Sequence, residues 1–268
     1  MQFTKAHGCG NDFIVVDARE NPALRLPELV ARAPRLCERR FGVGADGVLW
    51  VSEREGRAEM TVINADGSLS EMCGNGLRCV AHHLLLRGRL GEEGEVLTGA
   101  GALMVRAALT SDDGRAARVT VWMGHPRALS ARPFAGAAAP LTTLSMGNPH
   151  AVSLDEGDYA RRLALAEGWA REVEGGVNLS FARVRGEGLE LHVHERGCGW
   201  TLACGTGACA AVVAATARGL LPPGRPTRVS LPGGALEVRY EPGAGVWMTG
   251  PAEISFHGSV QGDPLNLI

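Results

Sequence analysis

The sequence predicts a mixed α+β (α/β) protein whose two halves share one topology. The main observation is a sixteen-residue segment that occurs twice, at 73–88 and 204–219, with a constant offset of 131 residues. Strand-like runs precede both copies at the same distance and follow them at an offset of 133 residues. The length of 268 residues is enough for two cores, because domains typically have roughly 100 to 200 residues.

Each copy of the repeated segment is predicted to form a helix that begins beside its cysteine. Gly88 and Gly219 end the copies, as C′ glycines commonly end helices. The second helix, 208–217, has smaller and more apolar residues than the first, so we expect it to be buried on all sides. In the first, apolar residues recur at the spacing of an amphipathic helix, at Leu77, Val80, Ala81, Leu84 and Leu85.

Strands are predicted before and after each helix. The runs 60–64 and 191–195 each end nine residues before their cysteine, so Asn64 and Glu195 have equivalent positions. A strand, a glycine turn and a second strand are predicted after each helix, at 95–106 and 228–239. A weaker echo relates residues 10–12 to 147–149.

The polar turn 111–115 divides the chain into a first half, 1–115, that carries Cys73 and a second half, 116–250, that carries Cys204. Two related halves place equivalent elements toward a shared site, where small molecules bind. We therefore expect the two thiols to belong to one site.

Composition excludes several functional classes. The net charge is −2 without a basic cluster, which argues against nucleic-acid binding. The N-terminus lacks the pattern of a signal peptide, and no uncharged run reaches the ~18 residues of a membrane span. We therefore expect a cytoplasmic protein whose seven cysteines stay reduced and are structural, catalytic or metal-binding.

The position of Cys73 and Cys204 at helix starts suits proton transfer. A helix N-terminus stabilises an anion, so it can hold a carboxylate or lower the pKa of a thiol from ~8.5 toward neutrality. One thiolate can then remove a proton from a carbon while the other thiol returns a proton on the opposite face. The helix starts would also stabilise the charge that forms on a carboxylate next to that carbon, without a metal or pyridoxal cofactor.

At these residues the chain resembles the diaminopimelate epimerase family. The resemblance covers nearly the whole chain and rests on seven motifs in order, of which the two that contain the cysteines are the most specific. The motifs are residues 7–13, 42–47, 64–68, 73–79, 146–150, 195–197 and 203–209.

The resemblance implies a cofactor-independent epimerase that interconverts LL- and meso-diaminopimelate, a precursor of lysine and peptidoglycan. Cys204 would accept a proton and Cys73 donate one in the LL-to-meso direction, with the roles reversed for the other isomer. The fold would be two similar domains, each a curved, mostly antiparallel sheet around a central helix, with the segment 251–268 returning to the first. The family also implies a homodimer.

The resemblance also implies the remaining site residues. His150 and Glu195 would assist the cysteines as catalytic residues. Substrate would be held by a larger set, which comprises Asn11, Asn64, Gly74, Asn75, Asn148, Asn178, Glu195, Arg196, Gly205 and Thr206.

The chain departs from the family pattern at four positions. Gly47 stands where some relatives have a glutamine that touches substrate, so that contact is absent here. Cys198 and Trp200 change the approach to the second cysteine. Cys9 replaces a more usual leucine, and we expect it to pack as a small apolar residue.

Alternative readings of the cysteines remain open. Cys37, Cys79, Cys198 and Cys209 are predicted to be structural, and the spacing of 198, 204 and 209 lacks the paired short spacings of a zinc site. No metal or cofactor is therefore expected. The competing functions are a proline or hydroxyproline racemase of the same fold, and a thiol redox or metal-binding protein in which Cys73 and Cys204 form a switchable disulfide.

Overall fold

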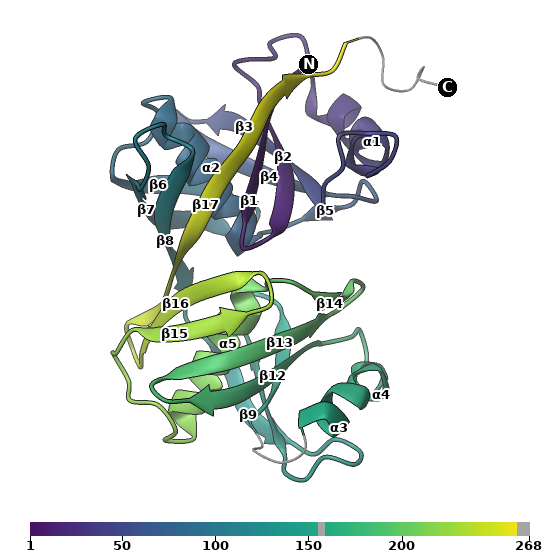
Figure 1. Ribbon diagram of the computed structural model, residues 1–268, viewed down its shortest axis with the longest axis vertical. Coiled ribbons are helices and arrows are strands. Elements are labelled where there is room, and N and C mark those ends of the chain that lie inside the picture. Colours follow the sequence, from purple (N-terminus) through teal and green to yellow (C-terminus); the bar gives the residue numbers. More distant parts are fainter. Residues whose placement is uncertain (155–158, 262–268) are drawn as a thin grey trace. The chain divides into compact units, whose positions relative to one another are not determined.

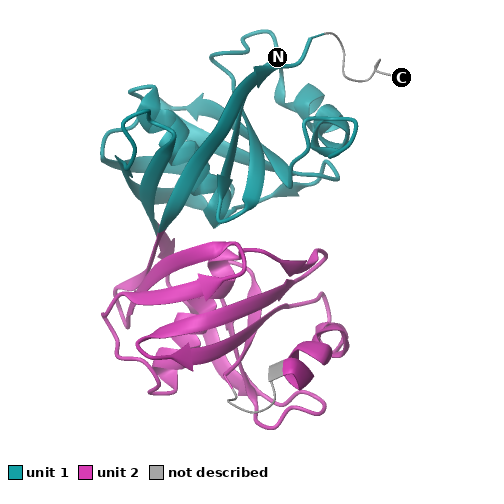
Figure 2. Ribbon diagram, in the orientation of Figure 1, with its two compact units in different colours: residues 1–121, 250–268 teal, residues 122–249 magenta. Residues whose placement is uncertain are grey.

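The computed structural model describes residues 1–154 and 159–261 and contains two compact units (Figures 1 and 2). Unit 1 consists of Met1–Val121 and the chain from Gly250 onward, and unit 2 consists of Trp122–Thr249. Part of the segment predicted to return to the first half, 262–268, lies outside the described residues. The predicted mixed α+β class, with sheets that are mostly antiparallel, is confirmed.

In its described residues, unit 1 contains two helices and strands that come from the first half of the chain and from the end of the last strand. Its elements are β1 (Gln2–Gly8), β2 (Asn11–Asp17), α1 (Leu26–Cys37), β3 (Gly47–Arg54), β4 (Arg57–Asn64), β5 (Leu69–Ser70), α2 (Gly74–Leu86), β6 (Glu93–Thr98), β7 (Gly101–Leu109) and β8 (Ala116–Gly124), which ends in unit 2.

Unit 2 repeats this plan and ends with a long strand that continues into unit 1. Its elements are β9 (Arg127–Arg132), β10 (Leu141–Ser145), β11 (Pro149–Ser153), α3 (Tyr159–Ala164), α4 (Ala166–Arg171), β12 (Asn178–Arg185), β13 (Gly188–Glu195), β14 (Gly199–Thr201), α5 (Gly205–Ala217), β15 (Thr227–Leu231), β16 (Gly234–Glu241) and β17 (Gly245–Ser259).

The strands of the two units have the same order of parallel and antiparallel pairs. In unit 1, β17, β1 and β2 are antiparallel neighbours, β2 is parallel to β3, β4 is parallel to β6, and β6, β7 and β8 are antiparallel. In unit 2, β9, β10 and β11 are antiparallel neighbours, β11 is parallel to β12, β13 is parallel to β15, and β15, β16 and β17 are antiparallel. The repeat in the sequence is therefore a repeat of topology.

A central helix packs against each sheet (Figure 1). Helix α2 contacts β1, β2, β3, β4 and β7, and α5 contacts β10, β11, β12, β13 and β16. Both helices have 13 residues. As predicted, α5 is buried almost throughout, with small side chains that let the sheet approach closely.

Helix α2 is more deeply buried than its amphipathic pattern predicts. Every residue from Gly74 to Leu84 is buried, because strands cover the side that the sequence pattern marks as polar. His82 and His83 are 0% and 1% exposed, and their rings bond to the Gly114 carbonyl and the Asp17 carboxylate. Both histidines are thus core packing residues.

The remaining helices of the described chain pack beside the sheets. Helix α1 joins a cluster that includes Ile14, Val48 and Ile63. In unit 2, Trp169 of α4 stacks on Phe181 of β12 with 5.7 Å between ring centroids. Within the described residues, none of the helices has the length and apolar character needed to cross a bilayer.

Candidate active site

In unit 1 the sulfur of Cys73 caps helix α2. Cys73 is the N-cap residue, with an extended backbone (φ −139°, ψ 113°), and its Sγ accepts a hydrogen bond from the N–H of Gly76 at 3.4 Å. An N-cap acceptor satisfies one of the amide groups that have no partner within the helix. The predicted placement of this thiol at a helix start is confirmed.

We call each capping cysteine and its polar neighbours a half-site. In unit 1, two asparagines complete it. Asn75 Nδ2 donates to Asn11 Oδ1 at 3.0 Å, and that oxygen lies 3.9 Å from Cys73 Sγ. Asn11 reaches this position because it begins β2 after a tight turn, in which Cys9 and Gly10 have φ values of 55° and 79°. The structure therefore brings together Cys73, Asn75 and Asn11.

Asp46 and Asn64 lie at the ends of neighbouring strands. Asp46 Oδ2 accepts from Asn11 Nδ2 at 2.7 Å, and Arg39 holds the other carboxylate oxygen. Asn64 ends β4, where its Nδ2 donates to Ser68 Oγ at 2.9 Å. Opposite it in the sheet is Gly47, where a Cβ would lie 2.8 Å from the Ile63 carbonyl oxygen. The structure has no room for a side chain at that position without a shift of the backbone.

In unit 2 the sulfur of Cys204 caps α5 with the same geometry. Cys204 is extended (φ −126°, ψ 109°), and its Sγ accepts from the N–H of Gly207 at 3.4 Å. The hydroxyl of Thr206, which is equivalent to Asn75, lies 3.5 Å from the sulfur. The two cysteines therefore share one backbone setting but have different polar neighbours.

His150 acts on this half-site through Asn148. It is 1% exposed, and burial lowers its pKa to about 3. The neutral ring donates from Nε2 to Asn148 Oδ1 at 2.9 Å, since that oxygen can only accept. The Asn148 Nδ2 then faces the Thr206 hydroxyl at 3.4 Å. His150 thus orients an amide and is not placed to take a proton near neutral pH.

Glu195, Arg196 and Asn178 are adjacent at the end of β13. Asn178 Oδ1 accepts from the Arg196 N–H at 3.0 Å, and Glu195 Oε1 accepts from Thr201 Oγ1 at 2.5 Å. Glu195 and Arg196 line a pocket of about 430 Å³. Arg171 of α4 lines the same pocket, and the sequence pattern had not singled it out.

The electrostatics of Cys204 differ from the expectation based on its helix alone. Burial raises the pKa of the thiol well above its usual value, and the charge of Glu195 and its hydrogen bond with the thiol raise it further. The hydrogen bonds from Thr206 and Gly207 lower it, but by less. The prediction of a lowered pKa is therefore wrong for Cys204, because desolvation outweighs the helix N-terminus.

The other five cysteines form no disulfide within the described residues. Cys9, Cys37, Cys79 and Cys209 are buried, and Cys198 is exposed. Burial raises the pKa of Cys37 to about 11 and that of Cys79 to about 12, so both are protonated at neutral pH. Trp200, 47% exposed, packs on His194 and Phe181.

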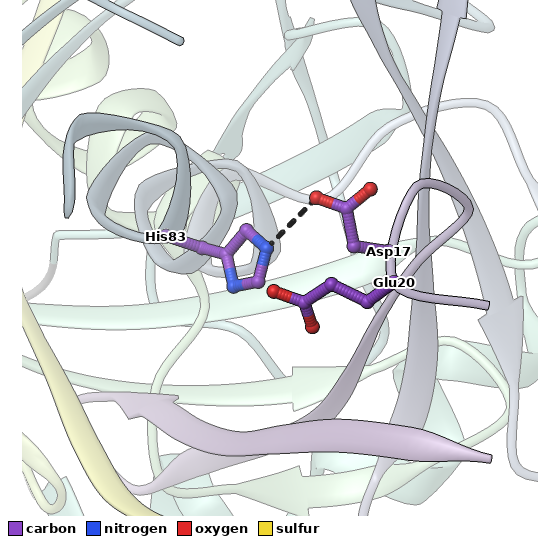
Figure 3. Close-up of side chains that lie close together, drawn as sticks. All are labelled: Asp17, Glu20 and His83. Atoms are coloured by element: carbon purple, nitrogen blue, oxygen red, sulfur yellow. Dashed lines mark hydrogen bonds and ion pairs between the residues drawn. The ribbon is translucent and has the colours of Figure 1, made fainter. Parts of the chain in front are cut away.

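A separate charged cluster lies beside α2 and has the residue types of a metal site. Asp17, Glu20 and His83 point toward one another, with ligand atoms within 4.8 Å (Figure 3). Arg89 forms an ion pair with Asp17, and Arg87 does so with Glu20 at 2.5 Å. Because each carboxylate already has a cation, the cluster is an ion-pair network in the described structure and not a set of available ligands.

Two residues of the first half-site were missed by the sequence analysis. Asp46 and Arg78 both lie within recognised motifs, 42–47 and 73–79, but neither pattern shows which partner a charged residue contacts. Asp46 bonds to Asn11 across 35 residues, and Arg78 bonds to Asn75 from within α2.

Comparison with known sequences shows the family of the chain. The model of the family described as diaminopimelate epimerase matches residues 3–129 and 142–255. A diaminopimelate epimerase of Synechococcus sp. (strain JA-3-3Ab) is 42% identical, over 97% of this chain and 98% of the relative.

Solved structures show the same fold at lower identity. A predicted epimerase from Pseudomonas aeruginosa has a TM-score of 0.75 at 16% identity, over 97% of this chain and 99% of the other. A hydroxyproline epimerase from Agrobacterium vitis, with bound trans-4-hydroxy-L-proline, has a TM-score of 0.67 at 17% identity, over 98% and 93%.

Proposed function

The chain belongs to the diaminopimelate epimerase family, and we propose that it interconverts LL- and meso-2,6-diaminopimelate at the α-carbon, in the synthesis of lysine and peptidoglycan precursors. The observation that carries the mechanism is the equivalence of the two cysteines. Each sulfur accepts the N–H of the third helical residue at 3.4 Å. Two thiols in one backbone setting, at the starts of topologically equivalent helices, suit a reaction that needs one proton carrier for each face of a carbon.

The proposed step moves one proton in and one proton out. A thiolate takes the α-proton as the C–H bond breaks, and the electron pair stays on the α-carbon and its carboxylate. The other thiol then gives its proton to the opposite face, which forms a new C–H bond and leaves a thiolate. The amides at Gly74, Asn75, Gly205 and Thr206 would stabilise the carboxylate charge.

Burial and the charge of Glu195 raise the pKa of Cys204 well above its usual value, so this thiol keeps its proton near neutral pH. By the family pattern, Cys204 donates in the meso-to-LL direction. A protonated Cys204 would be ready to donate its proton in that direction.

Substrate recognition is proposed for the polar residues around the two half-sites. Arg196 can bind a carboxylate bidentately, and it lies next to Glu195 in the unit 2 pocket. The proposed substrate contacts are Asn11, Asn64, Asn148, Asn178, Glu195 and Arg196, with the four helix-start residues named above.

Three further features belong to the proposal. The two units would correspond to the domains predicted as 1–115 with 251–268, and 116–250. The protein would act in the cytoplasm as a homodimer, which the family resemblance suggests. Light scattering of the purified chain measures the oligomeric state, and a monomer at assay concentration would contradict the dimer.

The test is exchange of the α-proton in deuterated water. The wild-type protein should convert LL-diaminopimelate to the meso isomer with deuterium at the α-carbon, and Cys73→Ala and Cys204→Ala should each lose epimerisation. Cys79→Ala and Cys209→Ala remove buried thiols from the same two helices and should stay active. Full activity after either of the first two substitutions would overturn the mechanism, and turnover of proline in place of diaminopimelate would overturn the substrate.

A further inference from the structure

Arg78 is a fully buried arginine within the helix that Cys73 caps. It is 0% exposed, and its guanidinium lies between the start of α2, the β1–β2 turn and the last strand. Nε donates to the Pro251 carbonyl at 3.1 Å, and Nη2 lies 4.0 Å from Cys9 Sγ. A Cβ at Gly8 would be 2.6 Å from Nη2, so the glycine leaves the space that the guanidinium fills.

The guanidinium determines which way the Asn75 amide points. Nη1 of Arg78 donates to Asn75 Oδ1 at 3.0 Å. An arginine can only donate, so this bond requires the oxygen of Asn75 to face Arg78 and the nitrogen to face away. Asn75 Nδ2 accordingly donates to Asn11 Oδ1 at 3.0 Å.

Asp46 determines the orientation of Asn11 from the other end. Its carboxylate can only accept, and it accepts from Asn11 Nδ2 at 2.7 Å. Both amides thus have a single orientation, with a cation at one end of the chain of bonds and an anion at the other. The result is that Asn11 presents its oxygen, an acceptor, to Cys73 Sγ at 3.9 Å.

The second half-site is built without this cation. The constant offset of the repeat places Cys209 in the position equivalent to Arg78, and Cys209 is a buried thiol. There the neutral His150 orients Asn148, and Thr206 contacts the sulfur directly. Between these two described helices, the buried arginine five residues after the capping cysteine is therefore specific to the Cys73 side.

We propose that Arg78 is a positioning residue for Cys73: it fixes the Asn75 amide, and through it holds Asn11 as a hydrogen-bond acceptor toward the thiol. Its positive charge also acts on the neighbouring thiols, since it opposes the effect of burial on the pKa of Cys9 and of Cys79. The charged or titratable groups around the chain of bonds include Lys5, Cys9, Asp12, Arg39, Asp46, Cys79 and Glu253. The effect on turnover rests on the proposed function, but the effect on Cys73 does not.

The first measurement is the pH dependence of alkylation by iodoacetamide, followed at each cysteine by peptide mass spectrometry. In Arg78→Met, the pH at which alkylation of Cys73 is half-maximal should differ from the wild-type value. The corresponding pH for Cys204 should be unchanged. Arg78→Lys keeps a donor and a charge and should restore part of the wild-type profile. Arg89→Met is the control, because Arg89 is also largely buried near α2 but bonds to Asp17 and Glu53; it should leave the Cys73 profile unchanged.

The second measurement is turnover of both isomers. Arg78→Met should lower kcat up to about 100-fold, as expected when a reacting group is misplaced by about 1 Å, with a smaller change in KM. Asn75→Asp tests the same chain with Arg78 intact, because a carboxylate accepts from Arg78 but cannot donate to Asn11. If Arg78 acts through Asn75, the double variant should lose no more than the worse single variant.

The outcomes separate this proposal from the proposed function. An unchanged Cys73 profile in both Arg78→Met and Asn75→Asp would overturn the positioning role, and so would equal shifts of Cys73 and Cys204. If Arg78→Met fails to fold, Arg78→Lys and Asn75→Asp decide the matter. A wild-type protein that does not epimerise diaminopimelate would contradict the function alone, since the alkylation experiment needs no substrate.

Discussion

At the scale of single residues, the two thiols are equivalent in backbone and unequal in chemistry. Both accept an amide N–H at the same distance, but Cys73 faces an asparagine oxygen and Cys204 faces a threonine hydroxyl and Glu195. A helix start is therefore only one contribution to the pKa of a thiol, and burial or a neighbouring carboxylate can exceed it.

The first prediction concerns Glu195. Glu195→Gln removes the negative charge that raises the pKa of Cys204, so alkylation of Cys204 should begin at lower pH. The midpoint should still lie above that of a free thiol, because burial is the larger cause. The measurement is the rate of Cys204 alkylation against pH.

The control for this experiment is Glu187→Gln. Glu187 belongs to the same unit and forms an exposed ion pair with Arg225, so its removal should leave the Cys204 midpoint unchanged. A midpoint that stays constant or rises in Glu195→Gln would show that the carboxylate does not act on the thiol.

At the scale of elements, each central helix begins in a space that admits only glycine comfortably. A Cβ at Gly207 would lie 3.0 Å from Val193 Cγ2 and 3.2 Å from Cys204 Sγ. A Cβ at Gly76 would lie 2.9 Å from Leu49 Cδ2. These glycines let the amide of the third helical residue approach the sulfur while the sheet packs behind it.

The second prediction is that Gly207→Ala destabilises the protein and displaces the sulfur. Overpacking costs about 1–3 kcal/mol, which exceeds the gain of about 0.5–1 kcal/mol from alanine in a helix. The midpoint of thermal unfolding should fall, and kcat should fall with it as the thiol moves.

Gly168→Ala is the matched control in the same unit. Gly168 lies in α4, and a Cβ there would have no neighbour within 4 Å among the described residues. This substitution should be neutral or slightly stabilising, with unchanged kcat. If the two variants have the same unfolding midpoint and the same kcat, the close contacts at Gly207 do not determine the position of the sulfur.

At the scale of the whole molecule, buried histidines link stability to pH. Burial lowers the pKa of His82, His83 and His150, so all three favour the neutral state in the fold. In the unfolded chain each titrates near its ordinary ~6.5. The unfolded state therefore binds more protons as the pH falls below that value, and stability decreases.

The third prediction is a loss of stability between pH 7 and pH 5. His150 alone should lower the free energy of unfolding by about 2 kcal/mol at pH 5, which is 1.36 kcal/mol for each of the 1.5 pH units below ~6.5. The carboxyl of Asp12 does not titrate between pH 7 and pH 5. Burial raises its pKa, but Arg39 and Lys5 lower the pKa to about 2. Thermal unfolding at several pH values measures the slope.

His150→Gln should have a smaller slope than the wild type in this range, because glutamine does not titrate. His125→Gln, which alters an exposed residue, should keep the wild-type slope. Equal slopes in all three proteins would mean that His150 takes up a proton in the fold, contrary to its burial.

Much of the site could be predicted because the signal is local. The helix starts at Cys73 and Cys204, and the strand ends at Asn64 and Glu195, follow from spacings within about ten residues. Local patterns of this kind specify the helix caps and strand ends that carry the polar residues.

The contacts that orient those residues could not be predicted in the same way. Asn11 meets Asp46, Asn75 and Cys73 across 35 to 64 residues, and the register of β1, β2 and α2 decides which atoms face each other. The amphipathic pattern of α2 also failed to show that its polar residues are buried, because strands distant in the sequence cover them.

By itself, the sequence determined the repeated topology and the family, through motifs that recur along the chain at fixed positions, and the two helix-capping cysteines, through residue types at short spacings. Only the tertiary structure decided how the two thiols differ. Arg78 and Asp46 orient the asparagines beside Cys73, whereas burial and Glu195 act on Cys204. The physical reason is that a hydrogen-bond orientation or a pKa depends on all the groups that surround an atom, and folding brings those groups together from distant parts of the chain.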